Sequence, residues 1–293
     1  MKSNLRVPEE TQKAGHAANQ TARTAASSQW MTLLARLGYA AKGVVYLIIG
    51  WLAVLVAIGA GGKTTDQRGA LQTINAQPFG KALLAIVIIG LIGFAIWCFL
   101  QAWFDTEGKG SDIKGIIGRL GYVVTGISYF VLAFGAFQLV TRTGTGSATK
   151  SSTTSTQDVT AQLLNHAWGV AVVVILGLII IGVACYMFAK AYTANFQRGL
   201  SLTGLSTRFS NGVVFLGRFG YAALGVVFSI IGIFLIVAAV QHNPHEAKGL
   251  DSALGTLAQQ PFGPLLLGIV ALGLVAYGAY SFFEARYRRV GVS

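Results

Sequence analysis

A four-residue motif that occurs three times constrains this chain more than any other feature. It consists of an arginine, a hydrophobic residue, a glycine and a tyrosine, and it begins at Arg36, Arg119 and Arg218. A glycine follows each arginine after seven residues, and a further small residue follows after another seven. Repetition in a constant order indicates a fold built from three equivalent units rather than around one asymmetric catalytic site. The small residues are Gly43, Gly126 and Gly225, and then Gly50, Ala133 and Gly232.

The composition places these units in a membrane. Of the residues, 54% are hydrophobic and only 11% are charged, whereas a soluble domain carries about 25% charged residues. Six apolar stretches are long enough to cross about 30 Å of hydrocarbon. We therefore predict an all-α membrane protein with a bundle of six transmembrane helices. The expected spans are 36–59, 80–104, 119–141, 167–192, 213–240 and 262–285.

The net charge of +12 indicates membrane topology rather than nucleic-acid binding. If the N-terminus is cytoplasmic, six Lys and Arg residues lie on the opposite side and the remaining 16 lie on the cytoplasmic side. Because Lys and Arg concentrate in cytoplasmic loops, we expect both termini in the cytoplasm. The same charges attract anionic headgroups, so we expect membrane lipids, and no nucleic acid, as partners. The six are Lys63, Arg68, Lys81, Arg142, Lys150 and Lys248.

Each unit contains two spans, so all three units enter the membrane from the same side. Parallel repeats predict a pseudo-threefold axis along the membrane normal. We place repeat 1 at 31–104, repeat 2 at 105–192 and repeat 3 at 193–293. Residues 1–30 lack the apolar segment of a signal peptide, and their polar composition predicts a disordered cytoplasmic arm.

The segments between the two spans of a unit also repeat. An A-L pair followed by P-F-G occurs in 66–80 and again in 251–263. We predict a short helix in each segment, capped by Asp66 or Asp251, with proline near the start of the next span. Repeat 2 has no P-F-G, and its residues 143–157 form a polar low-complexity segment that is predicted to be a loop.

Small and aromatic residues at seven-residue spacing predict the helix contacts. Small residues let membrane helices approach closely, and the neighbouring aromatic residues give a pattern typical of left-handed packing. In the second span of each unit, a small, an aromatic and a polar residue recur at steps of four and share one face. Cys98 and Cys185 are expected to be buried and unpaired. The aromatic residues with a predicted packing role are Tyr39, Tyr122, Tyr221, Trp97, Tyr186 and Tyr280.

In these motifs the chain resembles the bacterial membrane family called domain of unknown function 1206. The resemblance rests on the triple R-x-G-Y-x-x-x-G-x-x-[YF], on G-A-L and P-F-G, and on the Q-A, K-A and E-A ends of the second spans. It covers about 36–288 and implies a six-helix protein of the bacterial cytoplasmic (inner) membrane. It implies no activity, substrate or catalytic residue. Repeat 2 departs most from the family pattern.

A ring of polar and charged residues at the membrane edge is the first candidate site. Since the planar fork of arginine suits phosphate, the ring is a candidate for binding an anion, a lipid headgroup or a partner. The alternative is anchoring, in which the arginines extend to headgroups and Arg218 pairs with Glu284. The ring comprises Arg36, Arg119 and Arg218, which begin the first spans, and Gln101, Lys190 and Glu284, which end the second spans.

Lys42 is the second candidate, because it lies six residues into a span where the other repeats have Thr125 and Leu224. A charge inside a membrane is costly and raises the hypothesis of a functional site. The alternative is that Lys42 extends to the interface, since it is only about 9 Å from Arg36 along a helix. No acidic residue lies centrally in a span, which argues against a proton relay.

Other patterns support no chemistry. His242, His245 and Glu246 lie close together, but a metal site needs three or four ligands and a solvated loop explains them better. We expect no metal, cofactor or catalytic residue, and no enzyme. We favour an interaction protein whose basic cytoplasmic face binds lipid, a membrane partner or a second copy. The alternative is a channel or facilitator along the pseudo-threefold axis, and a membrane enzyme is favoured least.

Overall fold

The six predicted spans are present as six long helices. The structure, a computed structural model, describes residues 29–104, 113–141, 152–166, 168–200 and 206–288. Each long helix is long and apolar enough to cross a membrane, which confirms the all-α class. The predicted arm at 1–30 lies outside the described residues except for its last two. The long helices are α2 (Gln29–Ala57), α4 (Gly80–Phe104), α5 (Ile113–Thr141), α7 (Gly169–Thr193), α8 (Thr207–Val240) and α10 (Gly263–Tyr287).

The first helix of each repeat begins earlier than predicted. Helices α2 and α5 start about two turns, and α8 about three turns, before the arginine of the repeated motif, so that residue lies within a helix rather than at its start. In α8 the added turns are capped, because the Ser206 hydroxyl accepts a hydrogen bond from the Phe209 N–H at 3.4 Å. Hydropathy located the apolar part of α8 and missed its polar first turns, Thr207 to Gly212.

The long helices form an open row. The order of neighbours is α5, α4, α2, α10, α8 and α7. Three of the neighbouring pairs join different repeats, namely α4 with α5, α7 with α8, and α10 with α2. Two pairs lie within a repeat, α2 with α4 and α8 with α10. We call each interface between long helices a seam, and the corresponding α5–α7 seam of repeat 2 is open.

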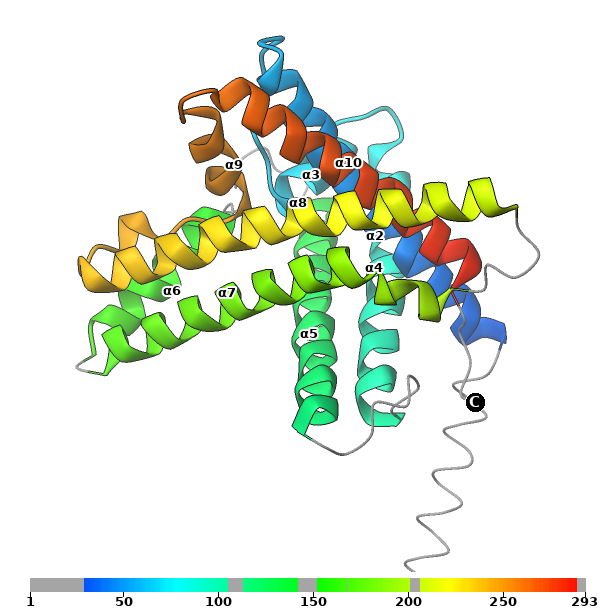
Figure 1. The fold of residues 1–293 in the computed structure, drawn as a ribbon, viewed down its shortest axis with the longest axis horizontal. Helices are drawn as coiled ribbons and strands as arrows, with labels where there is room; N and C mark the ends of the chain where they lie inside the picture. The colour runs from blue at the N-terminus through cyan, green and yellow to red at the C-terminus, as the bar shows by residue number, and fades with distance from the viewer. Residues whose placement is uncertain (1–28, 105–112, 142–151, 167, 201–205, 289–293) are drawn as a thin grey trace, which may run out of the picture.

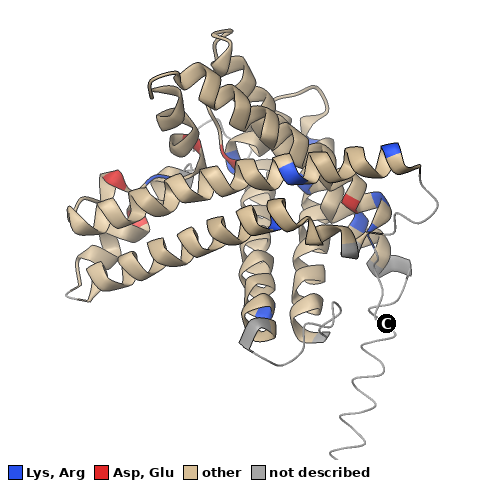
Figure 2. Cartoon of the chain, in the orientation of Figure 1, with Lys and Arg blue, Asp and Glu red and all other residues tan. Residues whose placement is uncertain are grey.

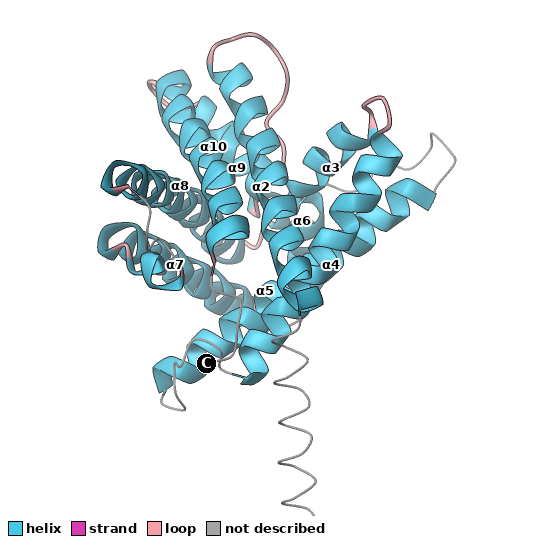
Figure 3. Cartoon of the chain, turned by 90° about the vertical axis from the view of Figure 1, so that its right-hand side faces the viewer, coloured by secondary structure: helices cyan, strands magenta, loops and turns pink. Residues whose placement is uncertain are grey.

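The three pairs that join different repeats splay apart. In Figure 1 the α2–α10 pair runs diagonally, between the steep α4–α5 pair and the flatter α7–α8 pair, and Figure 3 shows the same divergence from the side. All three repeats nevertheless point the same way. The starts of α2, α5 and α8, the helices that carry the motif arginines, lie toward the lower and right-hand side of Figure 1, and we call this side the arginine end. Figure 2 shows blue Lys and Arg gathered there, with long uncharged stretches of helix behind them.

The seams between repeats share one contact. The glycine seven residues after each motif arginine packs against a phenylalanine that lies nineteen residues into the second helix of the preceding repeat. A Cβ added to that glycine would lie 2.8–3.1 Å from the phenylalanine ring, so only glycine allows this approach. The pairs are Gly126 with Phe99, Gly225 with Phe188 and, closing the cycle, Gly43 with Phe282.

The two closed seams within repeats also share their contacts. Gly38 of α2 packs on Phe94 of α4, and Gly220 of α8 packs on the equivalent Tyr277 of α10. One turn further along, Ala41 meets Gly90, and the equivalent Ala223 meets Gly273. Small residues on both helices thus hold the two spans of repeats 1 and 3 together.

Repeat 2 departs from this arrangement. Gly121, which corresponds to Gly38 and Gly220, has no atom of another element within 4 Å of the position where a Cβ would lie. At the next contact, repeat 2 has Val124 and Ile179 in place of the alanine and glycine. The pseudo-threefold pattern therefore holds between repeats and is interrupted at α5–α7, because two branched side chains replace the smallest pair.

Three short helices lie at the other end of the bundle, which we call the short-helix end. In α3 the Asp66 side chain caps the helix as predicted, accepting from the Gly69 N–H at 2.7 Å. The predicted Asp251 cap is wrong, because α9 begins at Leu250 and its cap residue is Gly249, two residues earlier than predicted. The hydroxyl of Thr153 instead donates to Asp251 at 2.5 Å and accepts from the Gly249 N–H at 2.8 Å. The short helices are α3 (Gln67–Asn75), α6 (Ser152–Leu164) and α9 (Leu250–Ala258).

The loop predicted for 143–157 is wrong for its last residues, because α6 begins at Ser152. The polar side chains of this segment, which predicted a loop, bind α3 and the loop before α9. Ser155 accepts a hydrogen bond from Arg68 of α3 at 2.7 Å, and Gln157 donates to the His245 carbonyl oxygen at 2.9 Å. Tertiary hydrogen bonds therefore order a polar helix that has no apolar pattern of its own.

Candidate functional site

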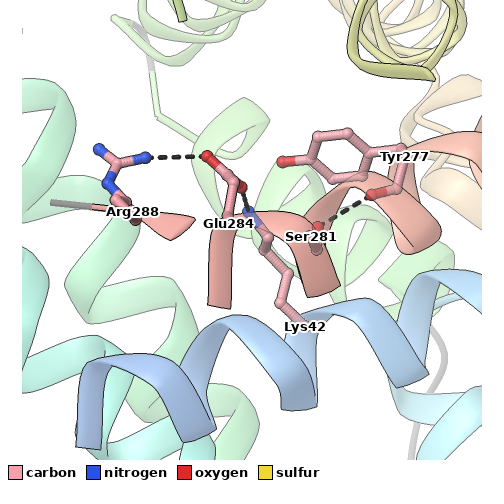
Figure 4. Close-up of polar contacts among 5 residues, drawn as sticks. All are labelled: Lys42, Tyr277, Ser281, Glu284 and Arg288. Atoms are coloured by element: carbon pink, nitrogen blue, oxygen red, sulfur yellow. Dashed lines mark hydrogen bonds and ion pairs between the residues drawn. The ribbon is translucent and has the colours of Figure 1, made fainter. Parts of the chain in front are cut away.

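A charged cluster lies buried between α2 and α10. The Lys42 ammonium is 2.9 Å from one carboxylate oxygen of Glu284, and Arg288 is 2.8 Å from the other (Figure 4). Lys42 is 5% exposed and Glu284 is 2% exposed. A buried pair of this kind is stable only when both charges are matched, and removing one partner typically costs about 3–5 kcal/mol.

The repeats explain why this pair forms at one seam alone. Lys42 and Glu284 occupy repeat positions that lie on the two facing helices of each seam between repeats. The α4–α5 seam has Gln101 and Thr125 at these positions. The α7–α8 seam has Lys190 with a leucine in the Lys42 position. The one acid and its matching base therefore meet only where α10 of repeat 3 closes onto α2 of repeat 1.

Aromatic rings surround the cluster. The Lys42 nitrogen lies 4.9 Å, 5.0 Å and 5.5 Å from the ring centroids of Tyr39, Tyr277 and Phe94. The Arg288 guanidinium lies 5.0 Å from the Tyr39 ring. Desolvated cations gain about 2 kcal/mol from such ring faces. Both cations therefore have partners inside the bundle, and the cluster stabilises the contact between α2 and α10.

The interpretation of Lys42 as a residue that extends to the interface is wrong. Its side chain turns inward, because Glu284 of α10 lies opposite it across the α2–α10 seam and accepts its hydrogen bond at 2.9 Å. The predicted pair between Arg218 and Glu284 is also wrong. Arg218 is exposed and donates to the Tyr192 carbonyl oxygen at 3.3 Å.

The remaining ring residues differ in exposure. Arg36 is exposed like Arg218, and Arg119 is half-buried. Gln101 is buried, as Glu284 is. Lys190 lies 4.3 Å from the ring centroid of Tyr221. The structure thus divides the predicted ring into outward-facing arginines and inward-facing residues of the second helices.

The repeated motifs and this geometry agree with the comparison against family models. The family described as Domain of Unknown Function (DUF1206) matches the chain at 37–105, 120–194 and 219–288. The chain belongs to DUF1206. It is also 36% identical over 261 residues to the "Uncharacterized protein YxxB" of Bacillus subtilis (strain 168), covering 89% of this chain and 92% of that protein. No solved structure matches.

The aromatic rows of this DUF1206 chain pack at the closed seams. Tyr39 meets Phe94 edge to face at 4.9 Å, and Tyr221 meets Tyr277 at 5.4 Å. Trp97 and Tyr280, at equivalent positions of α4 and α10, are buried with 1% and 0% exposure. In repeat 2 the counterpart Tyr186 is 58% exposed and Tyr122 is half-buried. These two aromatic residues are more exposed than their counterparts because α5 and α7 do not pack against each other.

Three groups of functional or packing residues were missed from the DUF1206 sequence. Arg288 lies beyond the last motif, and only the structure shows that it completes the charged cluster. Phe94 and Tyr277 recur fourteen residues into their helices, and this spacing could have revealed them. The phenylalanine of each seam between repeats recurs at nineteen residues in all three second helices. Those phenylalanines are Phe99, Phe188 and Phe282.

The two cysteines differ in exposure. Cys98 is buried, as expected, but Cys185 is exposed on α7, which makes that prediction wrong. His245 and Glu246 form a 3-10 turn (Pro244–Glu246). Among the residues that the structure describes, no three His, Cys, Asp or Glu side chains come together as metal ligands.

Proposed function

We propose that this DUF1206 protein is a non-enzymatic interaction protein of the bacterial cytoplasmic membrane, with both termini in the cytoplasm. Its arginine end binds anionic lipid headgroups or an acidic face of a membrane partner. The observation that carries the proposal is the separation of charge at this end. Lys42 and Arg288 both form ion pairs with Glu284, whereas Arg36 and Arg218 are exposed. Exposed arginines beside the headgroups suit phosphate and carboxylate.

The packing of the core supports the same proposal over solute passage. Tyr39, Tyr46 and Tyr277 are buried around the charged cluster. A cavity of about 450 Å³ lies between α2, α3 and α4, and its lining includes Val44, Ile74 and Val87. Its walls are apolar, so it suits an alkyl chain better than an ion. A channel remains the alternative function, and a flux of common ions through reconstituted protein would establish it.

The binding proposal is tested in nanodiscs of neutral lipid with and without phosphatidylglycerol. Anionic lipid should raise the Tm of the unaltered protein. The double variant Arg36→Gln with Arg218→Gln should lose most of this rise, because its exposed headgroup donors are gone. The matched control is Lys63→Gln with Lys81→Gln, which removes two exposed charges at the short-helix end. An equal rise in Tm for both double variants would overturn the proposal.

A further inference from the structure

The cavity of about 450 Å³ between α2, α3 and α4 lies at the short-helix end of repeat 1. Its lining residues Leu83 and Ile86 are 46% and 58% exposed and form its mouth, whereas Val87 is 7% exposed and lies deeper. The P-F-G segment, residues 78–80, lies in the chain between two lining residues, Gln77 and Leu83. We therefore call this cavity the P-F-G groove.

The lining of this groove recurs in repeat 3. Counted from the motif arginine or from P-F-G, seven of its eight residues are identical in the two repeats, and the eighth changes only from isoleucine to leucine. The two mouth residues are kept as Leu266 and Ile269, although they are exposed and core packing does not fix them. The four exposed residues of 81–89 outside the lining all differ in repeat 3, namely Lys81, Ala82, Ala85 and Ile89. The two repeats have therefore kept the groove itself and not the surface around it.

The P-F-G turn of both repeats contains a strained phenylalanine. Phe79 and Phe262 have φ angles of 62° and 60°, in the left-handed region that glycine favours. Packing inside the protein does not offset this strain, because the two rings are 86% and 80% exposed. Strained residues of this kind cluster at functional sites. Each ring is thus available to a molecule outside the chain, two residues after a glutamine that lines the groove or its counterpart.

The position of the groove relative to the span indicates an amphiphile as its occupant. The mouth at Leu83 and Ile86 belongs to the candidate span Gly80–Trp103, so it opens toward hydrocarbon rather than toward water. The polar lining residues Thr73 and Gln77 precede this span, where the headgroup region begins. A molecule that matches both parts has an apolar tail and a polar group at one end of it.

A partner helix does not fit the groove. A helix is about 10–12 Å wide and rises about 5.4 Å per turn, so a volume of 450 Å³ holds only one turn. Membrane helices pair through longer rows of small residues, whereas the mouth presents leucine and isoleucine. An acyl chain is narrow and bends at each methylene, so it can enter between these branched side chains. Among amphiphiles of the bilayer, a phospholipid therefore suits the groove better than a second copy of the protein does.

We propose that the P-F-G groove of repeat 1 and the equivalent surface of repeat 3 each hold one acyl chain of a membrane phospholipid. The ester group of that lipid meets the amide of Gln77 or Gln260, and the ring of Phe79 or Phe262 covers the chain. Repeat 2 has no P-F-G and has His166 in place of the glutamine, so we assign it no such site. The inference goes beyond headgroup binding at the arginine end, because these sites lie at the short-helix end and need no anionic headgroup.

The first test is native mass spectrometry of the protein released from nanodiscs of phosphatidylcholine alone, a lipid with no net charge. After mild delipidation the unaltered protein should keep one phosphatidylcholine in each of the two sites. Ile86→Trp fills the mouth of the groove in repeat 1 and should remove one of the two lipids, and Ile269→Trp should remove the other. The matched controls are Ile89→Trp, an exposed position of α4 outside the lining, and Ile175→Trp, the counterpart of Ile86 in repeat 2. Both controls should keep two lipids.

The second test removes the strained ring. Phe79→Gly suits a positive φ angle, so the Tm of the protein in detergent should not fall. The lipid retained in repeat 1 should nevertheless fall about tenfold, which corresponds to about 1.4 kcal/mol of lost contact. Retention that is unchanged in Phe79→Gly would overturn the role of the ring.

Three results would overturn the proposed lipid sites. They are the absence of retained phosphatidylcholine on the unaltered protein, equal retention in Ile86→Trp and Ile89→Trp, and a lipid-free dimer that Ile86→Trp abolishes. The last result would show that a second copy covers the groove. Arg36→Gln with Arg218→Gln should keep both phosphatidylcholine molecules, so a failure at the grooves leaves headgroup binding at the arginine end standing.

Discussion

The closed seams of repeats 1 and 3 and the open seam of repeat 2 are built from the same repeated motif. All three have the motif glycine, at Gly38, Gly121 or Gly220. They differ in the next contact, where an alanine and a glycine become Val124 and Ile179. In a membrane, two helices gain little hydrophobic energy by associating, so close packing decides whether they meet. One contact pair therefore separates a closed seam from an open one.

The seams between repeats explain why an open seam is tolerated. Each carries the same contact of glycine with phenylalanine, including the α10–α2 seam that joins the two ends of the chain. That seam also contains the buried ion pair of Lys42 with Glu284. The six helices thus stay together without α5–α7 packing, which leaves repeat 2 free for another role.

The largest loss of stability is expected from removing the ion pair in the α2–α10 seam. Glu284→Gln leaves Lys42 buried without a counter-charge and should lower the free energy of unfolding by about 3–5 kcal/mol. Urea or thermal unfolding in detergent measures this. Adding Lys42→Met should recover much of the loss. The control is Glu246→Gln, which removes an acid at the short-helix end and should change the free energy of unfolding little. A similar loss there would contradict a stabilising role for the charged cluster.

A smaller loss of stability is expected when a glycine of a closed seam, but not the equivalent glycine of the open seam, is replaced by leucine. Gly38→Leu forces a side chain into the backbone contact with Phe94 and should destabilise the protein by about 1–3 kcal/mol. Gly121→Leu places the same side chain in open space and should be nearly neutral. Thermal unfolding of the two variants compares them directly. Equal destabilisation would mean that α5 and α7 pack in solution.

The smallest perturbation needs no mutation. In detergent, Cys185 on the open side should react with N-ethylmaleimide in the folded protein, whereas buried Cys98 should react only on unfolding. Peptide mass spectrometry reads the two sites separately. Equal protection of both thiols would show that α7 is covered in the folded protein.

Much of this fold follows from local sequence. The spans at 80–104 and 119–141 are recognisable because hydropathy and repetition need no knowledge of neighbours. Helix α6 was missed for the opposite reason, since its polar residues are ordered by Arg68 and Asp251 from other repeats. The Lys42 partner was also missed. Glu284 can be recognised as that partner only once it is known that α10 of repeat 3 packs against α2 of repeat 1.

The sequence by itself determined the membrane class, the three repeats, the six spans and the small residues that let helices approach. Only the tertiary structure decided that α10 closes onto α2, that Lys42 turns inward to Glu284, and that repeat 2 stays open. The physical reason is that hydropathy and spacing are properties of one helix. An ion pair or a steric clash is a property of two, and it exists only after the fold has chosen which faces meet.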